Sequence, residues 1–265
     1  MRPDAPRPAA SDLGIELERL RAMARCEWRV REQSSLFGFL WTLLQPLLLF
    51  LVLLLVFTRW LGPRSPDFPA QLLIGVVHYG FFSSATLYAC TALRRRRGIV
   101  LNFPVPCELI VLSSVFSVAA SFLLELAVLA PIIAALGHPP TWSWVAVPFI
   151  AGMLVVGVAG LCLALAAVGA RFPDFERVWA IAVQAGFFLT PVFYRMSDVS
   201  PSHQHLIGLN PLARLIETAR VALLYGRLPD AGGAALGAAA AAALAAAGWA
   251  LFRSQRAHYG DDVAV

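Results

Sequence analysis

The sequence predicts an all-α integral membrane protein with six transmembrane helices, on the evidence of its composition, its long uncharged segments and the placement of its arginines. Of the 265 residues, 59% are hydrophobic and only 14% are charged, and the mean hydropathy is +0.71. A soluble domain is about half apolar and about a quarter charged. This chain therefore has too little polar surface to cover a globule in water, and we expect residues 1–265 to form a single transmembrane domain.

Six apolar segments are candidates for the spans, because a helix needs about 20 apolar residues to cross the hydrocarbon core. The third contains one charged residue, Glu125, and the others contain none. The fifth is short, and the sixth consists mostly of alanine, which is only mildly apolar. The predicted spans are 36–57, 68–93, 109–136, 142–170, 178–194 and 231–252.

The arginines predict the orientation of these spans. Placing the N-terminus in the cytoplasm puts 15 of the 21 basic residues, all of them arginine, in cytoplasmic segments. Cytoplasmic loops of membrane proteins carry such an excess. We therefore expect a multi-pass protein of the cell (inner) membrane with both termini in the cytoplasm.

Residues 13–31 form an amphipathic pattern rather than a span. Apolar residues recur every three or four positions, and the arginines lie off that stripe. The pattern predicts a helix lying in the membrane surface, and a soluble packing helix is the alternative. The apolar stripe contains Leu13, Leu17, Leu20, Ala24 and Trp28.

A second short helix is expected between spans five and six. Asn210 followed by Pro211 is typical of an N-cap and a first helical residue. Residues 211–225 are too few to cross a membrane, which predicts a re-entrant or surface helix on the outer side. Irregular backbone at membrane depth survives only inside protein or along a wet cavity, so the pattern favours a translocating protein over a passive anchor.

The sequence lacks the motifs of several functional classes. The chain has no lysine and hence no P-loop, and its arginines cluster beside the spans rather than in a nucleic-acid footprint. The four cysteines are scattered, without metal-ligand spacing. His203 and His205 in an outer loop could suggest a metal, but a solvated loop is the simpler interpretation, and we expect no metal site and no catalytic residue.

Three charged features have both a functional and a structural interpretation. Glu125 lies in the middle of span three, where an ionisable group indicates function unless it is a hydrogen-bonded structural acid. The run 94–97 of four arginines is explained mostly by membrane lipid phosphates near a span end. Arg171 and Asp174, either side of a proline that stops the helix, could fix an inner loop.

Aromatic residues are concentrated in spans one, two and five. They could form the interfacial belt of a membrane protein, or line a channel in which rings stack on sugars. The candidates for such a path are Trp41, Tyr79, Phe82, Tyr88, Phe187, Phe188, Phe193 and Tyr194.

Taken together, these features resemble the membrane subunit of type-2 ABC exporters for surface polysaccharides such as O-antigen, teichoic acid and capsule. The resemblance runs from about residue 15 to residue 262. It departs from the family pattern where four arginines replace a polar stretch after span two, and where no basic residue follows Pro104. The matching stretches are Ser35 to Pro46, Asn102-Phe103-Pro104, Arg171 to Asp174, Thr190 to Tyr194, Asn210-Pro211-Leu212 with Arg220, and Phe252 to Asp261.

The resemblance implies a homodimer in which each copy docks a separate ABC ATPase. The ATPase would bind ATP and magnesium, and this chain would need no cofactor of its own. The substrate would be a lipid-linked polysaccharide leaving past an outer gate at Asn210, Pro211 and Arg220. The ATPase-coupling candidates are Arg25, Arg29, Arg97, Asn102, Pro104, Arg171 and Asp174.

Two other functions stay open at this stage. One is a drug or lipo-oligosaccharide permease of the same exporter class. The other is a membrane enzyme that acts on lipid-linked sugars.

Overall fold

A computed structural model describes residues 10–32, 38–60, 62, 65–103, 105–256 and 259. Within these ranges the chain is helical and contains no strand, which confirms the all-α prediction. The elements are α1 (Ala10–Glu32), α2 (Gly38–Leu55), η1 (Val56–Trp60), α3 (Phe68–Cys90), α4 (Ala92–Arg95), α5 (Arg97–Asn102), α6 (Cys107–Ala135), η2 (Trp142–Val145), α7 (Ala146–Arg171), α8 (Phe175–Leu189), η3 (Met196–Asp198), α9 (Pro201–Gly208), α10 (Pro211–Leu224) and α11 (Ala231–Ser254).

Five of the described helical segments are long and apolar enough to cross a membrane, which confirms a multi-pass membrane protein. They coincide with the predicted spans one to four and six, within a few residues at each end. α8 has only 15 residues, so the count of six spans stays a prediction. It begins at Phe175, three residues before the predicted start, and ends at Leu189, because Thr190 is extended and precedes a proline.

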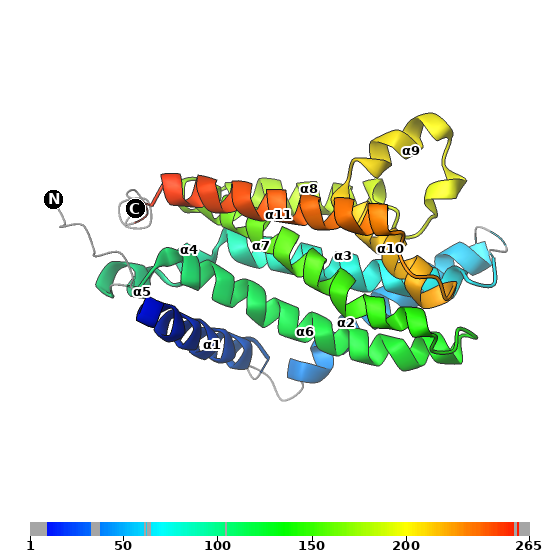
Figure 1. The fold of residues 1–265 in the computed structure, drawn as a ribbon, viewed down its shortest axis with the longest axis horizontal. Coiled ribbons are helices and arrows are strands. Elements are labelled where there is room, and N and C mark those ends of the chain that lie inside the picture. Colours follow the sequence, from blue (N-terminus) through cyan, green and yellow to red (C-terminus); the bar gives the residue numbers. More distant parts are fainter. Residues whose placement is uncertain are drawn as a thin grey trace.

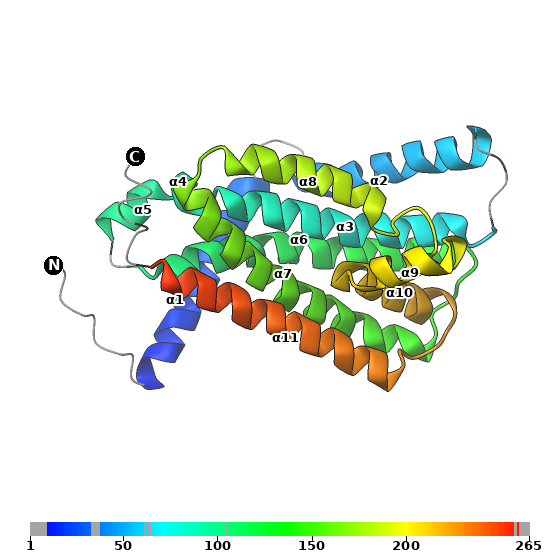
Figure 2. The ribbon, with the colours of Figure 1, turned by 90° about the horizontal axis from the view of Figure 1, so that it is seen from above.

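The long helices form one elongated bundle with α3 at its centre (Figures 1 and 2). α3 packs against α2, α6, α7, α8 and α10. In its most apolar stretch, 67% of the α3 residues are buried, compared with 6% for the first span, which includes α2. We name the two ends of the bundle the α5 end, where α4 and α5 lie, and the α9 end, where α9 and α10 lie.

The alanine-rich last span is explained by how it packs. α11 lies along α7 for most of its length (Figure 2). At Gly157 and Gly160 of α7, an added Cβ atom would meet the backbone of Ala241 and Ala245. Small residues allow backbones to approach this closely in membranes, so alanine serves here as a contact surface rather than as an apolar side chain.

The amphipathic helix predicted over residues 13–31 is confirmed as α1. α1 runs across the bundle axis near the α5 end (Figure 2) and packs on α6. Its apolar face also carries Glu27, which is buried. Its placement in a membrane surface stays a prediction.

The short helix after span five is α10, and it is inserted into the α9 end of the bundle. Its apolar face, including Ile216, Ala219 and Leu223, is buried against α3 and α7. Its last carbonyl groups would lack partners in an isolated helix. Here Ser143 donates to Ala222 O at 2.5 Å, and the Trp144 indole donates to Leu223 O at 3.1 Å.

Candidate functional site

The first part of the site is the junction between the end of α8 and the start of α10. The Asn210 side chain accepts a hydrogen bond from the Leu212 N–H at 3.0 Å, which confirms the predicted N-cap. The same side chain donates to Thr190 Oγ1 at 3.1 Å. One amide therefore begins α10 and holds the extended segment that follows α8.

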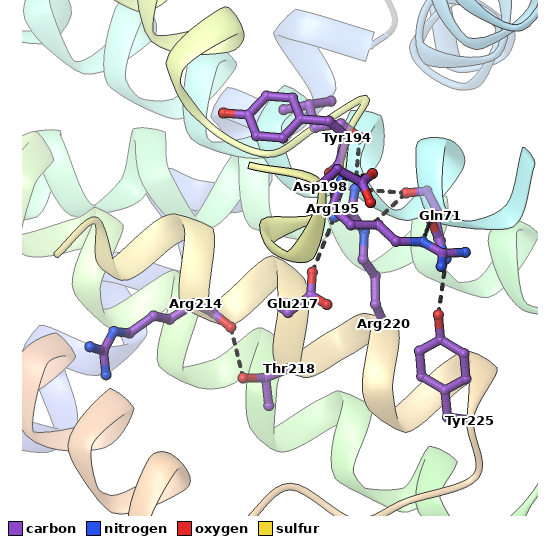
Figure 3. Close-up of polar contacts among 10 residues, drawn as sticks. Gln71, Tyr194, Arg195, Asp198, Arg214, Glu217, Thr218, Arg220 and Tyr225 are labelled. Atoms are coloured by element: carbon purple, nitrogen blue, oxygen red, sulfur yellow. Dashed lines mark hydrogen bonds and ion pairs between the residues drawn. The ribbon is translucent and has the colours of Figure 1, made fainter. Parts of the chain in front are cut away.

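Arg220 is the most deeply buried arginine of the described chain, with 2% of its surface exposed. Its guanidinium donates to three main-chain oxygens: Val192 at 2.7 Å, Gln71 at 3.1 Å and Tyr194 at 3.2 Å. It also pairs with Glu217 at 3.2 Å, one helical turn earlier. A buried charge is stable only with such partners, so Arg220 joins α10 to α3 and to the 190–195 segment (Figure 3). We call these residues the Arg220 cluster.

Gly75 of α3 lets this segment approach. A Cβ atom at this position would lie 2.5 Å from Val192 O and 3.1 Å from a terminal nitrogen of Arg220. Any other residue would push the 190–195 segment away from α3.

Gln71 and Arg195 belong to the same cluster, although the sequence analysis did not single them out. The Gln71 side chain accepts a hydrogen bond from Arg195 Nε at 2.8 Å and donates to the Tyr225 hydroxyl at 3.0 Å (Figure 3). The sequence contained one indication of the role of Gln71, which is the only amide side chain in the predicted span 68–93. A polar residue in a span needs a partner, and this one has partners on two other segments.

Six of the eight aromatic candidates lie together next to the Arg220 cluster. Neighbouring ring centroids in this group are 5.3 to 5.9 Å apart, including 5.3 Å for Tyr79 and Phe187 and 5.8 Å for Phe188 and Phe193. The Tyr79 hydroxyl donates to Val183 O at 2.5 Å, which fixes α3 against α8. We call this group the aromatic cluster; it consists of Tyr79, Phe82, Phe187, Phe188, Phe193 and Tyr194.

The other two aromatic candidates lie elsewhere. Trp41 is on α2, with 60% of its surface exposed. Tyr88 is at the α5 end, where its hydroxyl donates to the carboxylate of Glu27 at 2.7 Å. The structure therefore brings Tyr88 together with coupling candidates rather than with the aromatic cluster.

The run of four arginines is used for contacts between elements at the α5 end. Arg96 forms an ion pair with Glu27 of α1. The guanidinium of Arg95 lies 3.3 Å from the centre of the Tyr88 ring and also donates to Tyr88 O. α1 is thus attached to the end of α3 and to α4 by one buried carboxylate, which we call the Glu27 clamp.

Arg94 makes the next connection along the same end. It donates to Pro173 O at 3.1 Å and lies 3.8 Å from the carboxylate of Glu176 in α8. The turn between α7 and α8 is therefore tied to α4. The predicted pairing of Arg171 with Asp174 is wrong: Asp174 pairs instead with Arg177 at 2.9 Å, and both of these side chains are 85% exposed.

The coupling candidates that the structure describes are exposed and gather at the α5 end (Figure 1). Pro104 lies outside the described residues. The described ones are Arg25 and Arg29 on α1, Arg97 and Asn102 on α5, Arg171 at the end of α7 and Asp174 in the turn.

Glu125 is partly buried in α6 and lines a small apolar cavity beside Leu43 and Val77. This placement leaves both interpretations of Glu125 open. His203 and His205, predicted to lie in a loop, belong to the helix α9, where His203 Nδ1 lies 2.7 Å from Ser200 Oγ.

Comparisons with known proteins agree with one another. A family model described as "ABC-2 type transporter" matches residues 18–224. The O-antigen export system permease protein RfbA of Myxococcus xanthus is 28% identical over 92% of this chain and 95% of its own length. An RfbA protein of Klebsiella pneumoniae is 25% identical over 82% of this chain and 84% of its own length. The polysialic acid transport protein KpsM of Escherichia coli is 26% identical over 84% and 87%, respectively.

Proposed function

This chain belongs to the ABC-2 type transporter family, and we propose that it is the permease subunit of an exporter that moves lipid-linked surface polysaccharide out of the cytoplasm. It is a transport permease rather than an enzyme. The relatives are named for O-antigen export and for polysialic acid transport, which favours a polysaccharide over a drug as the cargo.

The aromatic cluster is the observation that carries this proposal. Its rings lie between the middle of α3 and the last part of α8 with the segment that follows it, and Phe188 is 62% exposed. Aromatic faces give contact area with few fixed polar requirements. Such a surface suits a long polymer whose successive sugars must bind and then leave.

The energy for export would come from a separate ABC ATPase that binds ATP and magnesium. We place its docking surface at the α5 end, which would face the cytoplasm of the inner membrane together with both termini. A permease moves between states only if its partner binds those states with different free energies. The Glu27 clamp and the Arg94 contacts would couple ATPase binding at α1 and the inner turns to movements of α3 and α8.

The transporter would contain two copies of this chain and two ATPase subunits. The exposed faces of α2 and α8, which lie on one side of the bundle in Figure 2, leave room for a second copy. A path for the polymer would then run between the copies, beside Trp41 and Phe188.

The test is a deletion of the gene with complementation. Surface polysaccharide should disappear, lipid-linked polymer should accumulate in the cytoplasm, and an inactive mutant of the ATPase should give the same result. Unchanged surface polymer with new drug sensitivity would favour a drug permease instead. Turnover of a lipid-linked sugar by this purified chain without the ATPase would contradict the transport proposal.

A further inference from the structure

A groove with a volume of about 620 Å³ lies at the α9 end between α9, α10 and the start of α11. Small-molecule sites usually have volumes of about 300–1,000 Å³. The groove lies on the opposite face of α10 from α3 and is separate from the aromatic cluster. Its lining includes polar and charged groups that the proposed path does not use.

One face of α10 supplies the polar wall. Glu217 and Thr218 follow Arg214 by about one helical turn, and all three residues line the groove. In Figure 3, Arg214 extends from α10 away from Arg220. Gln204 and His205 of α9 face them across the groove.

These groups are held in place by the fold. Arg214 Nε donates to Gly208 O, the last residue of α9. Glu217 is paired with the buried Arg220, and the Thr218 hydroxyl donates to Arg214 O at 2.7 Å, which leaves its oxygen as an acceptor toward the groove. A site whose polar groups are positioned beforehand loses less free energy on binding than a flexible one.

The charges of the lining select the class of ligand. The carboxylates of Glu217 and Asp230 disfavour the binding of an anion such as a phosphate by repulsion. The guanidinium of Arg214 disfavours the binding of a cation in the same way. The described residues contain no group of three or more His, Cys, Asp or Glu side chains that could hold a metal ion. Donors and acceptors of both kinds, beside the apolar Pro201 and Val221, suit a neutral molecule with hydroxyl groups and C–H faces.

We infer that this groove binds a neutral sugar unit of the exported polymer after it has passed the aromatic cluster. The inference rests on the proposed function and adds a second, outer binding site to it. A polymer held there would be hindered from sliding back while the ATPase resets.

Photo-crosslinking tests the occupant. The permease–ATPase complex would carry a photo-reactive benzoyl-phenylalanine at Thr218, or at Leu209, which is exposed at the same end and does not line the groove. The probe is the water-soluble polysaccharide that mild acid releases from the producing cells. Crosslinking to polysaccharide from position 218 and not from 209 is expected. Equal crosslinking at both positions, none at 218, or capture of a second copy of the permease at 218 would overturn the inference.

Filling the groove with a large side chain tests the role of the groove in export. Ala234 lines the groove and its neighbour Ala235 does not, so Ala234→Trp and Ala235→Trp form a matched pair. Ala234→Trp should slow export about tenfold, the effect of about 1.4 kcal/mol of lost binding, while Ala235→Trp exports normally. If Ala234→Trp is absent from the membrane, Thr218→Val replaces it as the test.

The two levels of the proposal fail in different ways. Normal export by the groove variant, in a strain whose gene deletion abolishes surface polymer, would refute the groove and leave the permease function intact. Surface polymer that survives the gene deletion would refute the permease function itself.

Discussion

The carboxylate of Glu27 in α1 forms an ion pair with the guanidinium of Arg96, between α4 and α5, and only 4% of the surface of Glu27 is exposed. The two residues lie 69 positions apart in the sequence. They connect the N-terminal helix to the segment that follows α3, and so they connect two of the surfaces proposed to contact the ATPase.

Glu27→Gln should therefore uncouple ATP hydrolysis from export. The amide can still accept from Tyr88 but cannot neutralise Arg96, which is partly exposed, so we expect a loss of about 1–2 kcal/mol of stability. Thermal unfolding in detergent and the amount of polymer exported per ATP hydrolysed would measure the two effects. Asp174→Asn, at an exposed pair, should change stability far less; an equal effect of both variants would contradict a special role for the clamp.

Replacing Arg220 should destabilise the α9 end and stop export. Arg220→Gln leaves the buried carbonyl groups of Gln71, Val192 and Tyr194 without their shared donor, and each unsatisfied group costs about 1–3 kcal/mol. Thermal unfolding of the purified protein and surface polysaccharide in cells give the readouts. Arg227→Gln, at an exposed arginine of the same end, is the matched control and should behave like the wild type.

Gly75→Ala should be destabilising although alanine is the better helix former. The new Cβ would lie 2.5 Å from Val192 O, so the 190–195 segment must move. Gly80→Ala in the same helix meets no atom within 4 Å and should be neutral or stabilising by up to about 1 kcal/mol. The melting temperatures of the two variants should move in opposite directions, and a similar shift for both would refute the close approach.

Removing an exposed ring should impair export without affecting assembly. Phe188→Ala and Trp41→Ala are expected to lower the export rate, while the ATPase still copurifies with the permease, because neither side chain is buried in the fold. Leu189→Ala, next to Phe188 and similarly exposed, controls for loss of apolar surface alone. Normal export by both aromatic variants would remove stacking from the proposed mechanism.

The sequence predicted the elements whose signals are local. The long apolar spans, the Asn210 cap and the position of α10 follow from hydrophobic length and capping, which act within a few residues of the chain. The grouping of Asn210 and Arg220 came from a family resemblance, and the structure brings both to one place.

Partners distant in the sequence could not be predicted in this way. Glu27 was hidden on the apolar stripe of an arginine-rich helix, and its partners Tyr88 and Arg96 come from other elements. Tyr88 was assigned to the aromatic path because the sequence does not distinguish an aromatic residue that lines a path from one in the interfacial belt or one in a contact such as the Glu27 clamp. Gln71 and Arg195 pair across 124 positions, a separation over which a single sequence contains no periodicity to follow.

The Arg220 cluster also sets an order of events during biosynthesis. Arg220 follows its acceptor Gln71 by 149 residues, so the ribosome completes α3, α6, α7 and α8 before the guanidinium exists. Until then the main-chain oxygen of Gln71 lacks its arginine donor, although Arg195 is already present for the side chain, and the half-made chain keeps an open notch that only α10 closes. A subunit is correctly completed only when α10 has filled this notch. A chain truncated before residue 220 should therefore remain a target for membrane quality control.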